Sequence, residues 1–262
     1  MSTAVEFIHV SKRFEDAASD AVEDVSFSIE EGELVTILGT SGCGKTTLLR
    51  MVNSLIRPSA GSIKVFDKDI SSTDPVELRR QIGYVIQQIG LFPHMTVRHN
   101  IATVPKILGW SKDKIDARVD ELLEMVNLDP DEFRDRYPSQ LSGGQQQRIG
   151  LARALAADPK LMLLDEPFGA IDAINRTVLQ DELINIHQKS RKTFLFVTHD
   201  ILEALKLGTR VMVMDKGSIR QFDTPSEILK NPADDYVKQL MDSFRQGFAF
   251  ALERGMGPGE QR

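Results

Sequence analysis

The fold is decided by one stretch near the start of the chain, Gly39-Thr40-Ser41-Gly42-Cys43-Gly44-Lys45-Thr46-Thr47. It matches the phosphate-loop pattern Gly-x-x-x-x-Gly-Lys-Thr, whose glycines let backbone N–H groups turn toward phosphates. Lys45 adds a positive charge at that point, and the Thr46 hydroxyl can ligate Mg²⁺. The alternative is a glycine-rich turn that binds no ligand.

The neighbouring sequence favours the phosphate loop. The short apolar run 34–38 comes before it and is rich in strand-forming residues, while apolar residues recur at helical spacing after it, at Leu48, Leu49, Val52 and Leu55. A strand, a glycine turn and a helix in this order set the phosphates at a helix N-terminus, where unpaired amides and the helix dipole favour anions.

Size and composition limit the class of protein. The 262 residues are 41% hydrophobic, enough for one sizeable core with a subdomain. The formal charge of −6 argues against nucleic acid as the main partner. No apolar stretch reaches the roughly 20 residues of a membrane span, and the N-terminus does not resemble a signal peptide. Cys43 is the single cysteine, so we expect a cytosolic protein without an intramolecular disulfide.

The remaining pattern predicts an α/β fold. Alternating apolar residues at Val25, Phe27 and Ile29 indicate an antiparallel strand, and further strands are expected at 62–66 and 82–86. Short apolar runs at 161–164, 194–197 and 211–214 are typical of parallel strands that are buried on both faces. A mostly helical block is expected from about 92 to 158. An apolar helical stripe continues past Met241, and 255–262 has a disordered composition.

Two strand ends carry polar side chains. Asp165 and Glu166 follow the run at 161–164, and because adjacent strand residues point to opposite sides, one carboxylate can face a metal and the other a water. We expect Asp165 to hold Mg²⁺ and Glu166 to act as general base. His199 ends the run at 194–197, and Asp200 is expected to cap the next helix with Glu203 three residues on.

A second signature, Leu141-Ser142-Gly143-Gly144-Gln145, precedes a predicted helix and forms a second anion-facing N-terminus. With this motif, residues 5–241 resemble an ATP-binding cassette (ABC) ATPase subunit of a transporter. The resemblance implies a phosphate-loop core with a mostly parallel sheet, an antiparallel β subdomain and a helical insertion at about 92–158, all within 1–241, followed by a helical tail at 242–262. It also implies a head-to-tail homodimer in which ATP lies between the phosphate loop of one subunit and the signature of the other.

The resemblance further implies the roles of individual residues. Gln87 is similar to the residue that senses Mg²⁺ and couples to the membrane partner, and His199 to the histidine that contacts the γ-phosphate. Asp172 matches a loop that touches the opposing subunit, with Ile171 in place of the usual leucine. Phe14 occupies the position of an aromatic residue that stacks on adenine. The implied nucleotide contacts are Phe14, Gly39, Ser41, Gly42, Gly44, Lys45, Thr46, Thr47, Ser142, Gly143, Gly144 and Gln145, and the implied magnesium ligands are Thr46, Gln87 and Asp165.

Two segments narrow the family, the run 82–97 with its Leu-Phe-Pro-His element and the run 104–110 that ends in Leu-Gly-Trp. They are similar to importers of glycine betaine, choline and carnitine, which implies a separate membrane permease, an extracytoplasmic substrate-binding protein and a location at the cytoplasmic face of the membrane. Trp110 is expected to pack in the core. The roughly twenty residues after Met241 are too few for the regulatory module pair of this branch, so regulation through that device is not expected. The alternatives are an importer of amino acids or sulfonates, and a soluble cassette ATPase of DNA repair or translation.

Overall fold

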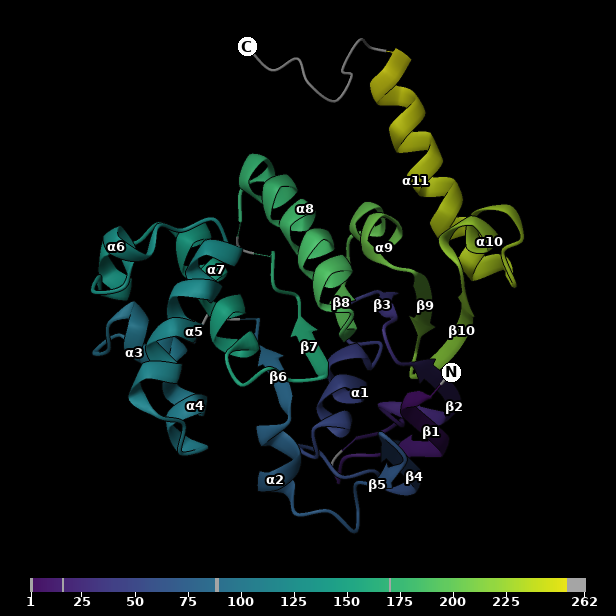
Figure 1. Cartoon of the computed structure of the whole chain (residues 1–262). Helices are drawn as coiled ribbons and strands as arrows, with labels where there is room; N and C mark the ends of the chain where they lie inside the picture. The colour runs from purple at the N-terminus through teal and green to yellow at the C-terminus, as the bar shows by residue number, and fades with distance from the viewer. Residues whose placement is uncertain (1, 16, 88–89, 170, 254–262) are drawn as a thin grey trace.

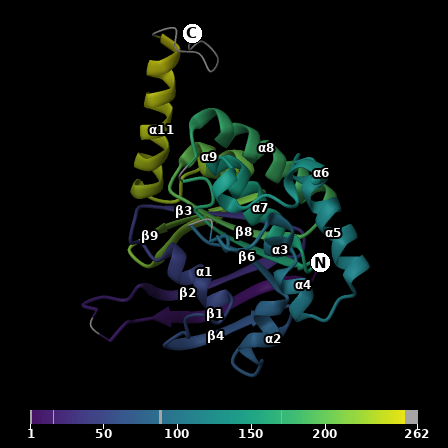
Figure 2. The same ribbon diagram turned by 90° about the vertical axis from the view of Figure 1, so that its left-hand side faces the viewer.

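The computed structural model describes residues 2–15, 17–87, 90–169 and 171–253, with side chains described as far as 246. Two sheets and the helices around them form three layers (Figures 1 and 2). In Figure 2 helices α7, α8 and α9 lie above the larger sheet, and helix α1 and the smaller sheet lie below it. The predicted disordered segment 255–262 falls outside the described residues.

The smaller sheet is antiparallel, with strand order β2-β1-β4-β5. Its strands are β1 (Thr3–Lys12), β2 (Val22–Glu30), β4 (Ala60–Val65) and β5 (Lys68–Asp69). Phe7 of β1 pairs with Phe27 of β2, and the two rings stack with centroids 4.5 Å apart. The antiparallel strand predicted from the alternation at 25–29 is therefore confirmed. Strand β1 and the short strand β5 were not predicted from the sequence.

The larger sheet has the order β10-β9-β3-β8-β7-β6, and the pairs from β9 to β6 are parallel. Its strands are β3 (Leu34–Gly39), β6 (Ile82–Val85), β7 (Leu161–Asp165), β8 (Thr193–Thr198), β9 (Arg210–Asp215) and β10 (Ser218–Asp223). Both faces are covered: Phe194 and Phe196 of β8 pack in the helical core, whereas Leu195 and Val197 pack between the sheets. This burial explains the continuous apolar runs.

Helices fill the chain between β6 and β7 and flank the sheet elsewhere. Helices α3 to α7 with one 3₁₀ turn occupy the region predicted to be helical, and apolar residues of α3, α5, α6 and α7 join one core cluster. The helices of this region are α3 (Val97–Ile101), α4 (Thr103–Ile107), α5 (Lys112–Met125), α6 (Pro130–Phe133) and α7 (Gly143–Leu155), with the 3₁₀ turn at Pro138–Gln140. The others are α1 (Lys45–Val52), α2 (Pro75–Arg80), α8 (Ala173–Ser190), α9 (Ile201–Leu207), α10 (Pro225–Lys230) and α11 (Asp235–Glu253).

Local signals account for several of the helix ends. The Ser111 hydroxyl accepts a hydrogen bond from the backbone of Lys114 at the start of α5, and Thr224 does the same at the start of α10. Trp110 is partly buried against the helical core, as expected, and Lys114 Nζ lies 3.7 Å from its ring centroid. Val237 and Met241 anchor the first turns of α11, and Figure 1 shows the rest of this helix rising away from the body.

Candidate functional site

The phosphate loop runs from the end of β3 to the first residue of α1, as predicted. Gly44 has φ of 104°, and a Cβ on it would lie 2.2 Å from the carbonyl oxygen of Ala21. Gly42 also has a positive φ, of 79°, with open space beside it. A Cβ on Gly39 would lie 2.3 Å from the carbonyl oxygen of Met214. The loop can adopt this path only because these positions carry no side chain.

Lys45 is buried at the base of the loop. Its ammonium donates hydrogen bonds to the carbonyl oxygens of Gly39 (2.7 Å) and Thr40 (2.8 Å). The loop opens on a hollow of about 550 Å³, which is large enough for a polyphosphate group. The hollow is lined by Ala21, Ser41, Gly42, Gly44, Lys45, Thr46, Thr47, Gln87, Glu166 and His199. The structure thus brings together predicted residues from four separate segments of the chain.

Asp165 lies beside the loop at the end of β7. Thr46 Oγ1 donates a hydrogen bond of 2.9 Å to Asp165 Oδ1, and Arg50 lies 3.9 Å from the other carboxylate oxygen. Burial raises the pKa of Asp165, although Thr46 and Arg50 act in the opposite direction. A hydroxyl and a carboxylate side by side at the phosphate loop are oxygen donors of the kind that Mg²⁺ prefers, with waters completing its shell. The donor chemistry of Thr46 and Asp165 therefore fits the predicted metal.

Glu166 faces Gln87 and His199 across the mouth of the hollow. Gln87 Nε2 donates a hydrogen bond of 3.1 Å to Glu166 Oε2, and His199 Nδ1 lies 3.4 Å from the same oxygen. The prediction that strand alternation turns Asp165 and Glu166 to opposite sides is wrong, because β7 ends at Asp165 and Glu166 has a left-handed φ of 46°. The turn after the strand, and not strand alternation, separates the two carboxylates.

The capping prediction at His199 holds only in part. Asp200 Oδ1 accepts a hydrogen bond of 3.1 Å from the backbone of Glu203, so Asp200 is the N-cap of α9. The Glu203 side chain does not return to the cap. It is buried and accepts hydrogen bonds from Thr198 Oγ1 and from Gln180.

The signature lies at the start of α7, where the Ser142 hydroxyl and the Gln145 side chain form a reciprocal capping box. The buried helical face predicted behind it is confirmed, with Ile149, Ala152, Leu155 and Ala156 almost fully buried. Ser142, Gly143, Gly144 and Gln145 do not line the hollow at the phosphate loop. Within one chain, the two predicted phosphate sites are separate.

Other predicted residues lie around these sites. Asp172 is the N-cap of α8 and accepts hydrogen bonds from the backbone and the side chain of Asn175. The Asn175 side chain lies beside Gly144 of the signature. Phe14 is 43% exposed, with Lys12 Nζ 5.2 Å from its ring centroid, and it does not line the hollow. Gln88 and Ile89, in the run 82–97, and Ala170, directly before Ile171, fall outside the described residues.

Two residues of the site were not predicted from the sequence, Arg50 beside Asp165 and Ala21 beside Gly44. Arg50 lies one helical turn after Thr46, so the i, i+4 spacing was a usable signal for it. Ala21 touches the loop through its backbone, for which the sequence offers no signal. Among the helices in the described ranges, none has the length and apolar character needed to cross a membrane.

Comparisons with known proteins agree with this geometry. The family model described as "ABC transporter" matches residues 22–169. The chain is 54% identical over 241 residues to the carnitine transport ATP-binding protein OpuCA of Listeria monocytogenes, covering 92% of this chain and 60% of that protein. It is 49% identical to the glycine betaine uptake system ATP-binding protein YehX of Escherichia coli, covering 90% of this chain and 76% of that protein.

The chain spans about 60% of the length of the first relatives it matches. Among solved structures, the ATP-binding cassette MJ0796, a dimer bound to ADP and Pi in a post-hydrolysis state, superposes with a TM-score of 0.75 at 32% identity. That superposition covers 84% of this chain and 98% of the other, and it confirms the predicted fold class. The chain belongs to the ABC transporter family.

Proposed function

We propose that this chain is the ATP-hydrolysing subunit that powers import of a quaternary-amine osmoprotectant, such as glycine betaine, choline or carnitine, through a separate membrane permease. The observation that carries the ATPase activity is the meeting of Lys45, Thr46, Gln87, Glu166 and His199 around one hollow. The cargo class is supported by relatives at about 50% identity that are named for carnitine and glycine betaine.

In the proposed reaction, the phosphate loop binds the triphosphate of ATP and Lys45 exchanges its loop carbonyls for phosphate oxygens. Glu166 accepts the proton of the attacking water, and Gln87 and His199 hold its carboxylate in position. Thr46 and Asp165, with Gln87 nearby, would hold Mg²⁺, which neutralises charge on the phosphates when bound. Phe14 is proposed to stack on adenine.

We further propose that two copies share each nucleotide. The separation of the signature from the phosphate loop within one chain supports this, because a single ATP can reach both motifs only across a dimer. The proposed partners are a second copy, the permease and an extracytoplasmic binding protein, and no nucleic acid. The chain would then sit at the cytoplasmic face of the membrane, with 1–241 as the cassette, about 92–158 as its helical subdomain and 242–262 as its tail.

Transport by the assembled complex tests the cargo. The chain is co-purified with its permease and binding protein and placed in lipid vesicles. ATP-driven uptake of labelled betaine, choline and carnitine is then measured, and amino acids and sulfonates are tested in parallel. We expect uptake of at least one of them, and its loss with Glu166→Gln. Uptake of only amino acids or sulfonates would overturn the cargo, and ATPase activity that rises only with nucleic acid would overturn the transport function.

A mixture of two variants tests the shared site. Gly143→Asp blocks the signature, and its Cβ has open space, so the fold is expected to persist. Lys45→Ala disables the phosphate loop. Each variant alone should form no ATP-dependent dimer in light scattering, whereas the equal mixture should form one, since a mixed dimer retains one intact shared site. A mixture that stays monomeric with ATP would refute sharing.

A further inference from the structure

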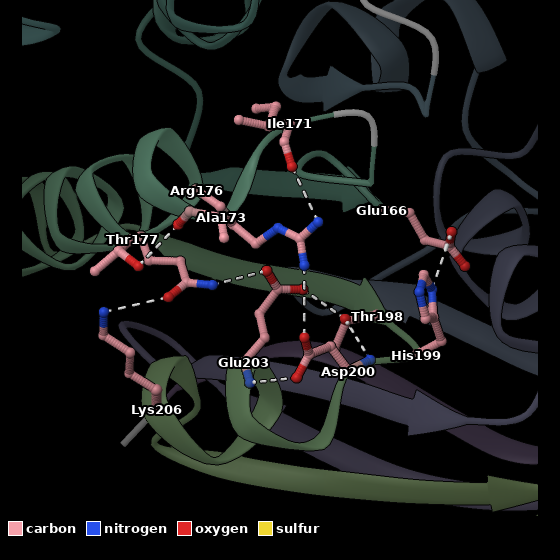
Figure 3. A network of polar contacts seen from close by, with 11 residues as sticks. Glu166, Ile171, Ala173, Arg176, Thr177, Thr198, His199, Asp200, Glu203 and Lys206 are labelled. Atoms are coloured by element: carbon pink, nitrogen blue, oxygen red, sulfur yellow. Dashed lines mark hydrogen bonds and ion pairs between the residues drawn. The ribbon is translucent and has the colours of Figure 1, made fainter. Parts of the chain in front are cut away.

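A buried polar network lies next to His199 and continues away from its contact with Glu166 (Figure 3). It joins residues of α8, the end of β8 and the start of α9. Thr198 and Glu203 are almost fully buried, as is Gln180 of α8. None of these residues lines the nucleotide hollow, so their polar groups have no place in the proposed reaction.

Glu203 is the buried anchor of the network. Its carboxylate accepts hydrogen bonds from Thr198 Oγ1 and from Gln180 Nε2 (3.0 Å), and Lys206 donates to Gln180 behind it (3.2 Å). The Thr198 oxygen in turn accepts a hydrogen bond of 3.0 Å from the backbone of Asp200. The residues on both sides of His199 are thus tied to one carboxylate. Because the Glu203 side chain is buried, its polar atoms need these hydrogen-bond partners, and the same burial raises its pKa.

Arg176 connects this anchor with the loop that follows Glu166. Its Nη2 donates a hydrogen bond of 3.0 Å to the carbonyl oxygen of Ile171, and its Nη1 lies 3.7 Å from Asp200 Oδ2. Ile171 lies five residues after Glu166, and Asp200 directly follows His199. One rigid guanidinium therefore joins the two loops that carry the reacting carboxylate and the histidine.

We propose that Arg176 and Glu203 are positioning residues that fix His199 against Glu166. Glu203 fixes the end of β8 on both sides of His199, and Arg176 sets the spacing between the two loops. The 3.4 Å approach of His199 to Glu166 depends on this bracing, because the imidazole itself is largely exposed and has little packing to hold it. This inference rests on the proposed function for the roles of Glu166 and His199, but the geometry it describes exists without nucleotide.

The test reads the His199 ring directly. The full chain is labelled with carbon-13 at histidine Cε1 and its NMR spectrum is recorded. The His199 signal among those of the five histidines is assigned by its loss in His199→Gln. In nucleotide-free protein, Arg176→Gln, Asp200→Asn and Thr198→Val should each shift this signal and leave those of His9 and His187 in place. Asp200→Asn keeps the N-cap, because asparagine caps helices as well as aspartate does.

The matched control is Arg98→Gln. Arg98 and Asp116 have side-chain exposures of 32% and 34%, against 32% and 36% for Arg176 and Asp200, and they join two helices remote from the site. This variant should leave the His199 signal unchanged. An Arg176→Gln protein that is folded and keeps the wild-type His199 signal would overturn the proposal, and so would a Thr198→Val protein that does.

Kinetics supply the second readout. Arg176→Gln should lower kcat roughly ten- to a hundredfold with KM for ATP within about twofold, since displacement of a reacting group by about 1 Å costs up to about a hundredfold. The double variant Arg176→Gln/Asp200→Asn should be no slower than either single variant, because both remove one interaction. Additive losses would overturn the proposal. Absence of ATPase activity in the wild type would instead count against the proposed function, while the histidine signals still decide the positioning role.

Discussion

Glu166→Gln separates catalysis from structure at the candidate site. The amide has the size of the carboxylate and keeps an oxygen that can accept the hydrogen bond from Gln87. What it loses is the charge beside His199 and the ability to take a proton. Replacing a charge-assisted hydrogen bond by a neutral one costs about 1 kcal/mol, which corresponds to a fall in Tm of roughly 2–4 °C for a chain of this size.

The loss of a general base is a much larger effect. It lowers the rate by about 100- to 10,000-fold, equivalent to roughly 3–5 kcal/mol of activation free energy. We therefore expect kcat for phosphate release at saturating ATP to fall by at least about a hundredfold. The Kd of a fluorescent ATP analogue should change less than about threefold, because Lys45 and the loop are untouched. Thermal unfolding of the same preparation measures the change in Tm.

Glu182→Gln is the matched control. Glu182 is likewise a hydrogen-bonded glutamate, although it is buried and Glu166 is only partly buried. It accepts a hydrogen bond from Asn127, pairs with Arg148 at 3.2 Å, and lies outside the hollow. It should lower Tm by as much as Glu166→Gln or more, with kcat unchanged. If Glu166→Gln retained kcat within about tenfold of the wild type, the assignment of the general base would be wrong.

Two further variants probe the loop and the buried carboxylate. Gly39→Ala should lower the free energy of unfolding by about 1–3 kcal/mol in urea titrations, because its methyl group would clash with the carbonyl oxygen of Met214. An unchanged urea midpoint would contradict this, since it would mean that β9 moves aside without loss of stability. Burial raises the pKa of Asp165 above 3.8, so the unfolded chain ionises first and the native state loses stability as the pH rises through the folded pKa. In magnesium-free buffer Asp165→Asn should therefore gain stability over the wild type between about pH 3 and pH 7, with the two proteins equal at about pH 3. A difference that does not vary with pH would contradict this sign.

Much of the core sheet could be predicted because its strands are buried on both faces and are therefore continuously apolar. β8 is buried on both faces, so its whole run Phe194-Leu195-Phe196-Val197 is apolar and stands out from its flanks. β10 carries Arg220 and Gln221 and is only partly buried, so it lacks such a run and was missed. β5 has two residues, Lys68 and Asp69, and depends on pairing with β4 instead of any local preference.

The site residues were predictable where a motif fixes backbone and chemistry together, as in the phosphate loop from Gly39 to Thr46. The arrangement around them was not. The left-handed turn at Glu166 is imposed by tertiary contacts, since glutamate does not prefer that conformation. Glu203 has the spacing of a capping residue relative to Asp200, yet burial against Thr198 and Gln180 determines where its carboxylate points. Spacing along the chain cannot reveal a partner that is distant in sequence.

The position of β3 between two strands that come much later in the chain has a consequence for biosynthesis. β3 lies between β8 and β9, so Leu34 has to wait for Phe194 and Arg210 pairs with Val35 still later. At ribosomal rates of about 5–20 residues per second, roughly 10–30 s separate the appearance of β3 from that of β8. During this interval both edges of the apolar strand β3 lack the partners that satisfy their backbone groups, and such an exposed strand is prone to aggregate. Nucleotide can therefore assist folding only at the last stage, once the distant strands have met.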